Sequence, residues 1–238
     1  MKPCVHCATS KAKQKNMVKL SESPKAEKPG GRIFLDLCKT RVPKDDGTEY
    51  VIGNKHMKTM VDQAMGKKGV DFKTTKSGMV ELTCKFFNVM KAKGIPIRIV
   101  CLDPAGENVA LEKRCESVDW AHLQPMTFEF TSRDTPQHNS PAEEGPTYIC
   151  NKARAMMGAD YISSEVRGRV GVEAIKNVTQ LNRLVLTTLN GVTKSRDEHI
   201  YGVNPNWVKN MRRWSGHRRQ RRKNWLSWNT NDVSGILR

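Results

Sequence analysis

Two short apolar segments, each carrying one aspartate, constrain the fold of this chain more than any other feature. Arg32–Cys38 reads RIFLDLC, and Ile97–Asp103 reads IRIVCLD. Runs of this length and composition are typical of strands buried in a sheet. A carboxylate inside or at the end of a buried strand costs free energy unless another group pairs with it. Asp36 and Asp103 are therefore the first candidates for a functional site.

The rest of the central chain alternates strand and helix patterns. The helix pattern is clearest at Gly78–Lys93, where Met79, Leu82, Phe86 and Val89 are spaced by three and four residues. The other expected elements are strands near 48–63 and 70–76, a strand at Met126–Thr131, and helices at 140–158 and 163–186. This order predicts a mixed α/β sheet covered by helices.

If the two aspartate-bearing strands lie side by side, Asp36 and Asp103 can share a divalent cation, because Mg²⁺ prefers oxygen ligands. Glu143 is a candidate third ligand, since it lies in RDTPQHNSPAEEG between an expected strand and an expected helix. Two alternatives need no metal. LDPAG can be a plain turn, and Ser140, Pro141 and Glu143 can be the N-cap, first residue and capping-box acid of a helix.

The charge of the chain is concentrated at its two ends. Of a formal net charge of +17, residues 1–31 contribute +5 and residues 209–238 contribute +8. Such an excess is typical of proteins that bind phosphate-rich partners or anionic membrane surfaces. We find no apolar stretch of about 18 residues and no signal-peptide pattern, and the seven cysteines are mostly isolated. We therefore expect an intracellular protein in a reducing compartment, without a membrane-spanning segment.

Four segments occur in an order that one known family shares. They are CVHC at 4–7 with the Lys-rich stretch after it, RIFLDLCK at 32–39, LDPAGEN at 102–108 and TPQHNSPAE at 135–143. These segments resemble, in turn, the end of the zinc-binding module, the strand with the first Asp, the Asp-x-x-Gly-Glu segment and the TPQ-x-N-x-x-A-E signature of copia-type LTR retrotransposon integrases. The wording of AKQKN and SGMVELTC is most similar to elements of diatoms or oomycetes.

The resemblance implies a ribonuclease H-like fold, the retroviral integrase core, with a mixed five-stranded sheet flanked by helices. It implies that Asp36, Asp103 and Glu143 are the catalytic residues and hold two Mg²⁺ or Mn²⁺ ions. One ion would activate an attacking water or DNA 3′-hydroxyl and the other would stabilise the leaving oxygen, so no Ser or Cys nucleophile is expected. The expected contacts with DNA come from Thr135, Gln137, Asn139, Lys152, Arg212, Arg213, Arg218 and Arg219.

The sequence departs from the family pattern at Pro104-Ala105, where Asn-Gly is common, and at Glu144, where Arg is common. Pro146 falls one turn into the expected helix, where it can kink the helix or delay its start. Cys4 and Cys7 have the spacing of a zinc half-site. Because the family supplies the other ligands from a His pair upstream, we expect no complete zinc site in this chain.

We expect three regions: a basic linker with a zinc-module remnant at 1–31, the catalytic core at 32–190, and a basic, poorly ordered extension at 191–238. The Arg-rich stretch 212–223 is interpreted as a DNA-binding arm or a nuclear-localisation signal. The alternative is that the family resemblance ends at Trp214 and that a shifted reading frame produced the tail after it. The expected function is Mg-dependent strand transfer or cleavage of DNA, in the nucleus. The alternatives are an inactive nucleic-acid-binding relic and a cellular ribonuclease H-like nuclease. Further expected partners are a second copy of the chain and other parts of a retroelement polyprotein.

Overall fold

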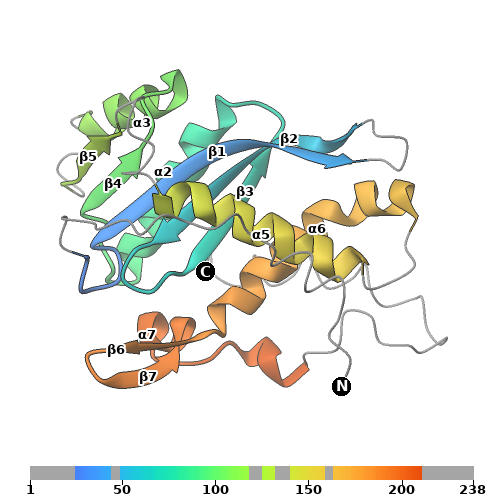
Figure 1. The fold of residues 1–238 in the computed structure, drawn as a ribbon. Helices are drawn as coiled ribbons and strands as arrows, with labels where there is room; N and C mark the ends of the chain where they lie inside the picture. Colours follow the sequence, from blue (N-terminus) through green and yellow to red (C-terminus); the bar gives the residue numbers. More distant parts are fainter. Residues whose placement is uncertain (1–24, 44–48, 118–124, 132–139, 159–162, 211–238) are drawn as a thin grey trace.

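The computed structural model describes residues 25–43, 49–117, 125–131, 140–158 and 163–210. Within them the chain forms a five-stranded sheet with helices on both faces, and a separate two-stranded sheet (Figure 1). No helix in these ranges is long and apolar enough to cross a membrane. Most of the residues expected to contact zinc or DNA lie outside the described ranges: Cys4, Cys7, Thr135, Gln137, Asn139, Arg212, Arg213, Arg218 and Arg219.

The large sheet has the strand order β3-β2-β1-β4-β5. Its first three strands, β1 (Arg32–Pro43), β2 (Glu49–Asp62) and β3 (Lys68–Lys73), form an antiparallel meander. The last two, β4 (Ile99–Leu102) and β5 (Thr127–Phe130), run parallel to β1. The two apolar segments with aspartates are therefore neighbours in the centre of the sheet.

One face of the sheet packs against α2 (Gly78–Ala92) and α3 (Gly106–Glu116). The amphipathic spacing of α2 directs Phe87 and Met90 into this core. They meet side chains from both central strands, and the buried members of the cluster are Ile33, Leu35, Met60, Cys84, Phe87, Met90, Ile97, Val100, Leu102, Leu111 and Cys115. Sequence pattern does not predict α3, because only Asn108, Leu111 and Cys115 of its side chains are buried.

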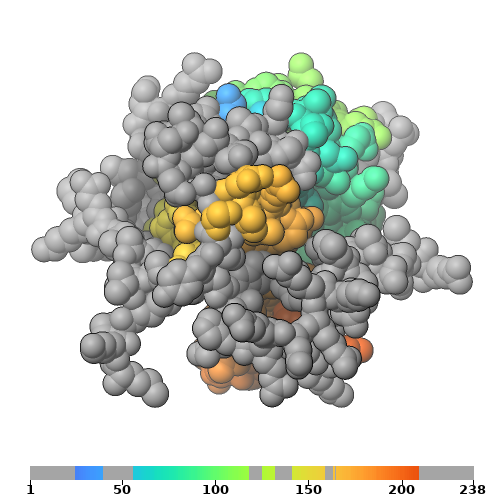
Figure 2. Space-filling model, turned by 90° about the vertical axis from the view of Figure 1, so that its right-hand side faces the viewer, coloured from blue at the N-terminus to red at the C-terminus, as the bar shows by residue number. Residues whose placement is uncertain are grey.

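The opposite face packs against α5 (Ser140–Gly158) and α6 (Ser164–Arg183). Their buried side chains gather around Met57 of β2, and include Ile149 and Ala153 of α5 and Ile175 of α6. The helix α5 runs through Pro146, so the proline does not delay its start. Figure 2 shows the outer surface of α6, in orange-yellow, at the centre of one side of the molecule.

The structure confirms the predicted fold class, a mixed five-stranded α/β sheet flanked by helices. The expected helix at 140–158 is observed with the same bounds. The expected helix at Gly78–Lys93 is observed at Gly78–Ala92. Both central strands also lie where the apolar runs place them, because a run of this kind is buried on both sides by neighbouring strands and helices.

The chain stays folded past residue 190, which corrects one expectation. β6 (Leu186–Leu189) and β7 (Val192–Ser195) form a hairpin across the expected domain boundary. Its two turn residues, Asn190 and Gly191, both have positive φ, as a type I′ turn requires. The short helix α7 (Arg196–Tyr201) and the 3₁₀ helix η2 (Asn206–Asn210) follow. A poorly ordered extension from residue 191 is therefore wrong for 191–210.

Candidate active site

Asp36 and Asp103 lie at the same level on neighbouring parallel strands. In the register of β1 and β4, Phe34 lies opposite Cys101. Continuing this offset by two residues places Asp103, the residue after β4, opposite Asp36. Neighbouring strands lie about 4.8 Å apart, so the two aspartates are within reach of a shared cation. The juxtaposition predicted from the two apolar runs is thus present in the backbone.

A buried cluster joins the start of α5 to the sheet beside these aspartates. Its members are Phe34, Val61, Cys101 and Ala142. Phe34 and Cys101 each precede one of the two aspartates by two residues, and Ala142 precedes Glu143 by one. Packing of three apolar side chains from the sheet against Ala142 therefore brings the third candidate carboxylate toward the other two.

Gly145 of α5 packs directly against β2, and only a residue without a side chain fits there. A Cβ at this position would lie 2.8 Å from Cγ2 of Val61 and 3.1 Å from Cγ2 of Thr59. Thr59 is the cross-strand partner of Asp36. A larger residue at position 145 would push the first turns of α5, and Glu143 with them, away from the strand that carries Asp36.

The three carboxylates repel one another. The pKa of Asp36 is raised above its ordinary value of 3.8, first because the side chain is half-buried, then because Asp103 and Glu143 are negatively charged nearby. A hydrogen bond from the backbone at Leu37 opposes this rise only in part. Asp103 and Glu143 are exposed. A divalent cation among these side chains would favour the ionised form of Asp36.

Asp103 is held by the helix that follows it. The Nδ2 atom of Asn108, in the first turn of α3, donates hydrogen bonds to the backbone oxygen and to Oδ1 of Asp103. The contact with the backbone oxygen is 3.1 Å long. The orientation of this carboxylate therefore depends on α3 and on the turn at Pro104-Ala105.

The carboxylates of Asp36, Asp103 and Glu143 are suitable ligands for magnesium, although the described side chains are not arranged around an ion. Three carboxylates are hard oxygen ligands of the kind that Mg²⁺ prefers. Beside Asp36, Oγ1 of Thr59 is buried and makes no hydrogen bond within the described part of the chain. In that same part, no group of three or more His, Cys, Asp or Glu side chains is close enough to hold a metal. Closing the site around an ion therefore requires these side chains to reorient.

The cysteines near the site are poor nucleophiles. Burial, followed by the neighbouring Cys150 and Asp36, raises the pKa of the Cys38 thiol to about 12. Burial and a hydrogen bond with Glu129 raise the pKa of Cys101 to about 12. Because the thiolate is the reactive form of cysteine, these thiols are inert at neutral pH.

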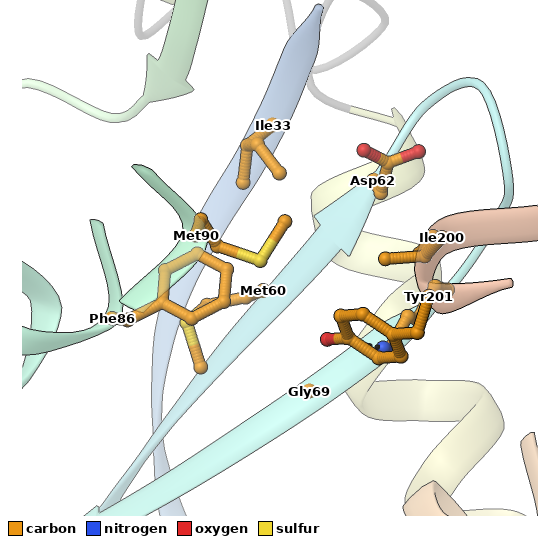
Figure 3. Close-up of a pocket in the computed structure, with 9 residues that line it drawn as sticks. Ile33, Met60, Asp62, Gly69, Phe86, Met90, Ile200 and Tyr201 are labelled. Carbon is orange, nitrogen blue, oxygen red and sulfur yellow. Dashed lines mark hydrogen bonds between the residues drawn. The ribbon is translucent and has the colours of Figure 1, made fainter. Parts of the chain in front are cut away.

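A small pocket lies on the other face of the sheet, away from the three carboxylates (Figure 3). It has a volume of about 60 Å³ and is lined mainly by apolar side chains, among them Ile33, Met60 and Met90. Ligand sites for small molecules are usually on the order of 300–1,000 Å³. This pocket is too small and too apolar to be a nucleotide site.

Several residues that shape the site escape sequence reasoning. Gly145 and Thr59 matter because α5 and β2 touch, and a single sequence does not show that contact. Asn108 lies within LDPAGEN, but its bond to Asp103 requires α3, which the pattern did not predict. Lys58 of β2, whose Nζ donates a hydrogen bond to Oδ1 of Asn108, gives a clearer signal, since a lysine interrupts the apolar strand sequence MKTMV.

No family model and no curated protein matches this chain by sequence. Among solved structures, the chain is similar to the HTLV-2 integrase catalytic core domain in complex with magnesium. The trimeric form gives a TM-score of 0.46 at 15% identity, over 73% of this chain and 97% of that one. The dimeric form gives a TM-score of 0.45 at the same identity and coverage. The simian T-cell lymphotropic virus intasome in complex with PP2A regulatory subunit B56 gamma gives 0.49 at 13% identity, over 84% of this chain and 63% of that one.

Proposed function

We propose that this chain is an integrase-type catalytic domain that carries out Mg-dependent phosphoryl transfer on DNA, either strand transfer or endonucleolytic cleavage. The observation that carries the proposal is the parallel pairing of β1 with β4, whose register, continued by two residues, brings Asp103 opposite Asp36, with Glu143 close enough to raise the pKa of Asp36. A cluster of mutually repelling carboxylates beside a central strand is costly for the fold and useful for binding cations.

In this proposal, Asp36, Asp103 and Glu143 are the ligands of two Mg²⁺ or Mn²⁺ ions. The ions would supply an activated attacking oxygen and charge stabilisation for the leaving oxygen. Asp36 contributes a half-buried carboxylate on a central strand, so its position varies little. Glu143 is exposed on the first turn of α5, so it can move toward the aspartates when charge is neutralised between them.

The exposed side of α5 is the proposed path for DNA. Lys152 lies nine residues after Glu143 on the same helix, and its Nζ lies 5.8 Å from the centre of the Tyr148 ring. Arg154 is exposed two residues further on. Lysine and arginine on such a surface neutralise phosphates whatever the base sequence, so we expect affinity for DNA to fall steeply with salt.

The test compares neighbouring carboxylates on one helix. The purified chain is incubated with Mn²⁺ and a labelled duplex that mimics an element end, and cleaved or joined products are measured. We expect Glu143→Gln to reduce the reaction about a hundredfold or more, as do Asp36→Asn and Asp103→Asn. Glu144→Gln is the matched control, because Glu144 is exposed beside Glu143 and outside the proposed site. Equal activities of the Glu143 and Glu144 variants would refute the proposed triad.

A second candidate is a nucleic-acid-binding relic without catalytic activity. It is favoured by the lack, within the described residues, of a three-ligand group already close enough for a metal. The same assay separates the two candidates. Salt-dependent binding of the duplex, with no product that depends on the three carboxylates, would favour the relic.

We further propose a copia-type retrotransposon origin, a nuclear site of action and assembly with a second copy or other polyprotein segments. These proposals rest on the motif resemblance of TPQHNSPAE and LDPAGEN. Reading the genomic DNA on either side of the gene tests the origin. Protease and reverse-transcriptase reading frames beside it would support a retroelement.

A further inference from the structure

A buried lysine lies next to the candidate active site on the opposite face of the sheet. Lys58 of β2 is only 2% exposed. Its neighbours are the α2 and α3 layer, including the buried thiols of Cys84 and Cys115. Burial lowers the pKa of Lys58 to about 8, although Glu107, Cys84 and Asp103 oppose the effect. Within the described residues, Lys58 makes no ion pair shorter than 4.0 Å. The fold therefore gains little stability from this charge.

Asn108 links this lysine to Asp103. Lys58 Nζ donates a long hydrogen bond of 3.5 Å to Oδ1 of Asn108. The Nδ2 atom of the same side chain donates to the backbone oxygen and to Oδ1 of Asp103. Because Asn108 is 1% exposed, water does not compete for either end of the amide. The lysine fixes which end of the amide faces the aspartate, since only an oxygen can accept its proton.

The first turn of α3 is also held from the other side. Glu107 forms an ion pair of 3.0 Å with Lys76, which lies just before α2. The first turn of α3 is therefore contacted by Lys58 at Asn108 and by Lys76 at Glu107. These two contacts restrain the first turn of α3, and Asn108 links that turn to Asp103.

We propose that Asn108, oriented by Lys58, is a positioning residue that aims the carboxylate of Asp103 at the metal ions. This inference rests on the proposed function. Oδ1 of Asp103 accepts the amide hydrogen bond, which leaves Oδ2 to bind a metal ion. Partners that orient metal-binding carboxylates in this way contribute about tenfold to a hundredfold in metal affinity or activity.

The test measures metal binding separately from catalysis. Binding of Mn²⁺ to the full chain is followed by electron paramagnetic resonance, and activity is followed on the labelled duplex. The variants are Asn108→Leu, Lys58→Met and the double variant. The double variant removes the lysine charge and its acceptor together, so it leaves no unpaired buried charge and should fold. Asn182→Leu is the control, because Asn182 is also 2% exposed and accepts a hydrogen bond from the backbone of Lys68.

We expect Asn108→Leu and the double variant to bind Mn²⁺ about tenfold to a hundredfold more weakly than the parent. We expect Asn182→Leu to lower the melting temperature without changing Mn²⁺ affinity. The effect of Lys58→Met should be larger when Asn108 is present than when it is replaced, because the lysine acts through the amide. In the Asn108→Leu background only the removal of a positive charge remains.

Two results overturn the inference, and two others overturn the proposed function on which it rests. Unchanged Mn²⁺ affinity in the double variant would show that Asn108 only stabilises the turn. Equal effects of Lys58→Met in both backgrounds would show that the lysine acts by its charge alone. If the parent binds no Mn²⁺, or if Asp36→Asn binds as well as the parent, the proposed function fails and the inference fails with it.

Discussion

The carboxylates of Asp197 and Asp36 lie in opposite electrostatic surroundings. Asp197, at the start of α7, is fully buried between two cations. Its Oδ1 lies 2.9 Å from Nζ of Lys67 and its Oδ2 lies 2.6 Å from the guanidinium of Arg183. Asp36 is half-buried, and its charged neighbours are Asp103 and Glu143, which raise its pKa further than burial alone.

The carboxylate of Asp197 therefore stabilises the fold, whereas the ionised carboxylate of Asp36 destabilises it. The ion pairs of Asp197 connect α7 to α6 and to the turn between β2 and β3, which are far apart in the sequence. Asp36 makes no comparable connection within the described residues, and an uncharged side chain would suit its strand better. Burial and the charges of Asp103 and Glu143 therefore oppose ionisation of Asp36, whereas two cations pair with Asp197.

The largest expected effect is at the paired carboxylate. Asp197→Asn leaves two cations without their buried partner, so we expect a loss of roughly 3 kcal/mol in the free energy of unfolding. Urea unfolding followed by circular dichroism measures it. Glu165→Gln is the control, since Glu165 pairs with Arg169 on the exposed surface of α6 and should cost less than about 1 kcal/mol. Similar losses in both variants would remove the structural role assigned to α7.

A smaller effect is expected where α5 meets the sheet. Gly145→Val places side-chain atoms where Val61 and Thr59 already lie, so we expect destabilisation by about 1–3 kcal/mol. Because the helix must move, the variant should also lose the influence of Glu143 on Asp36 and most of the DNA-cleaving activity. Gly78→Ala is the control, because a Cβ built at Gly78 has no neighbour closer than 3.4 Å. Full activity of Gly145→Val would show that Glu143 does not depend on this contact.

The contrast between Asp197 and Asp36 also shows what the sequence could reveal. Asp36 is visible because it interrupts RIFLDLC, and the apolar pattern alone predicts its strand. No sequence pattern marks Asp197, because it follows a polar hairpin and its partners Lys67 and Arg183 are 130 and 14 residues away. The apolar pattern therefore predicts the central sheet and its two aspartates, but not the folded segment 186–210 that Asp197 ties to α6 and to Lys67.

Long-range contacts explain the remaining gaps at the site. Asn108 and Lys58 are 50 residues apart. Their hydrogen bond exists only because the fold brings the start of α3 close to the side chain of Lys58 on β2. The hairpin of β6 and β7 could have been predicted from Asn190-Gly191, a dipeptide that favours type I′ turns. Its flanking strands are short and largely exposed, so the apolar pattern is weak there.

The smallest expected effect is that of Asp36→Asn, which should stabilise the fold at neutral pH, whereas Asp197→Asn should destabilise it. A raised pKa means that folding favours protonated Asp36, so this carboxyl stabilises the fold below its ordinary pKa of 3.8 and loses that contribution as the pH rises through the raised value. At neutral pH, Asp36→Asn should therefore be slightly more stable than the parent, with a melting temperature roughly 1–3 °C higher. The difference should shrink as the pH is lowered toward 4.

Magnesium should reverse this difference, so that the parent has a higher melting temperature than Asp36→Asn. The parent gains stability from an ion that binds only the folded state, in proportion to the logarithm of its concentration, whereas Asp36→Asn lacks a ligand and gains little. Melting temperatures are measured at pH 7 with and without Mg²⁺, and Glu144→Gln serves as the variant that removes a nearby charge outside the site. If Asp36→Asn is less stable than the parent without metal, Asp36 supports the fold as Asp197 does. If Mg²⁺ shifts all three proteins equally, the ion binds elsewhere on the chain.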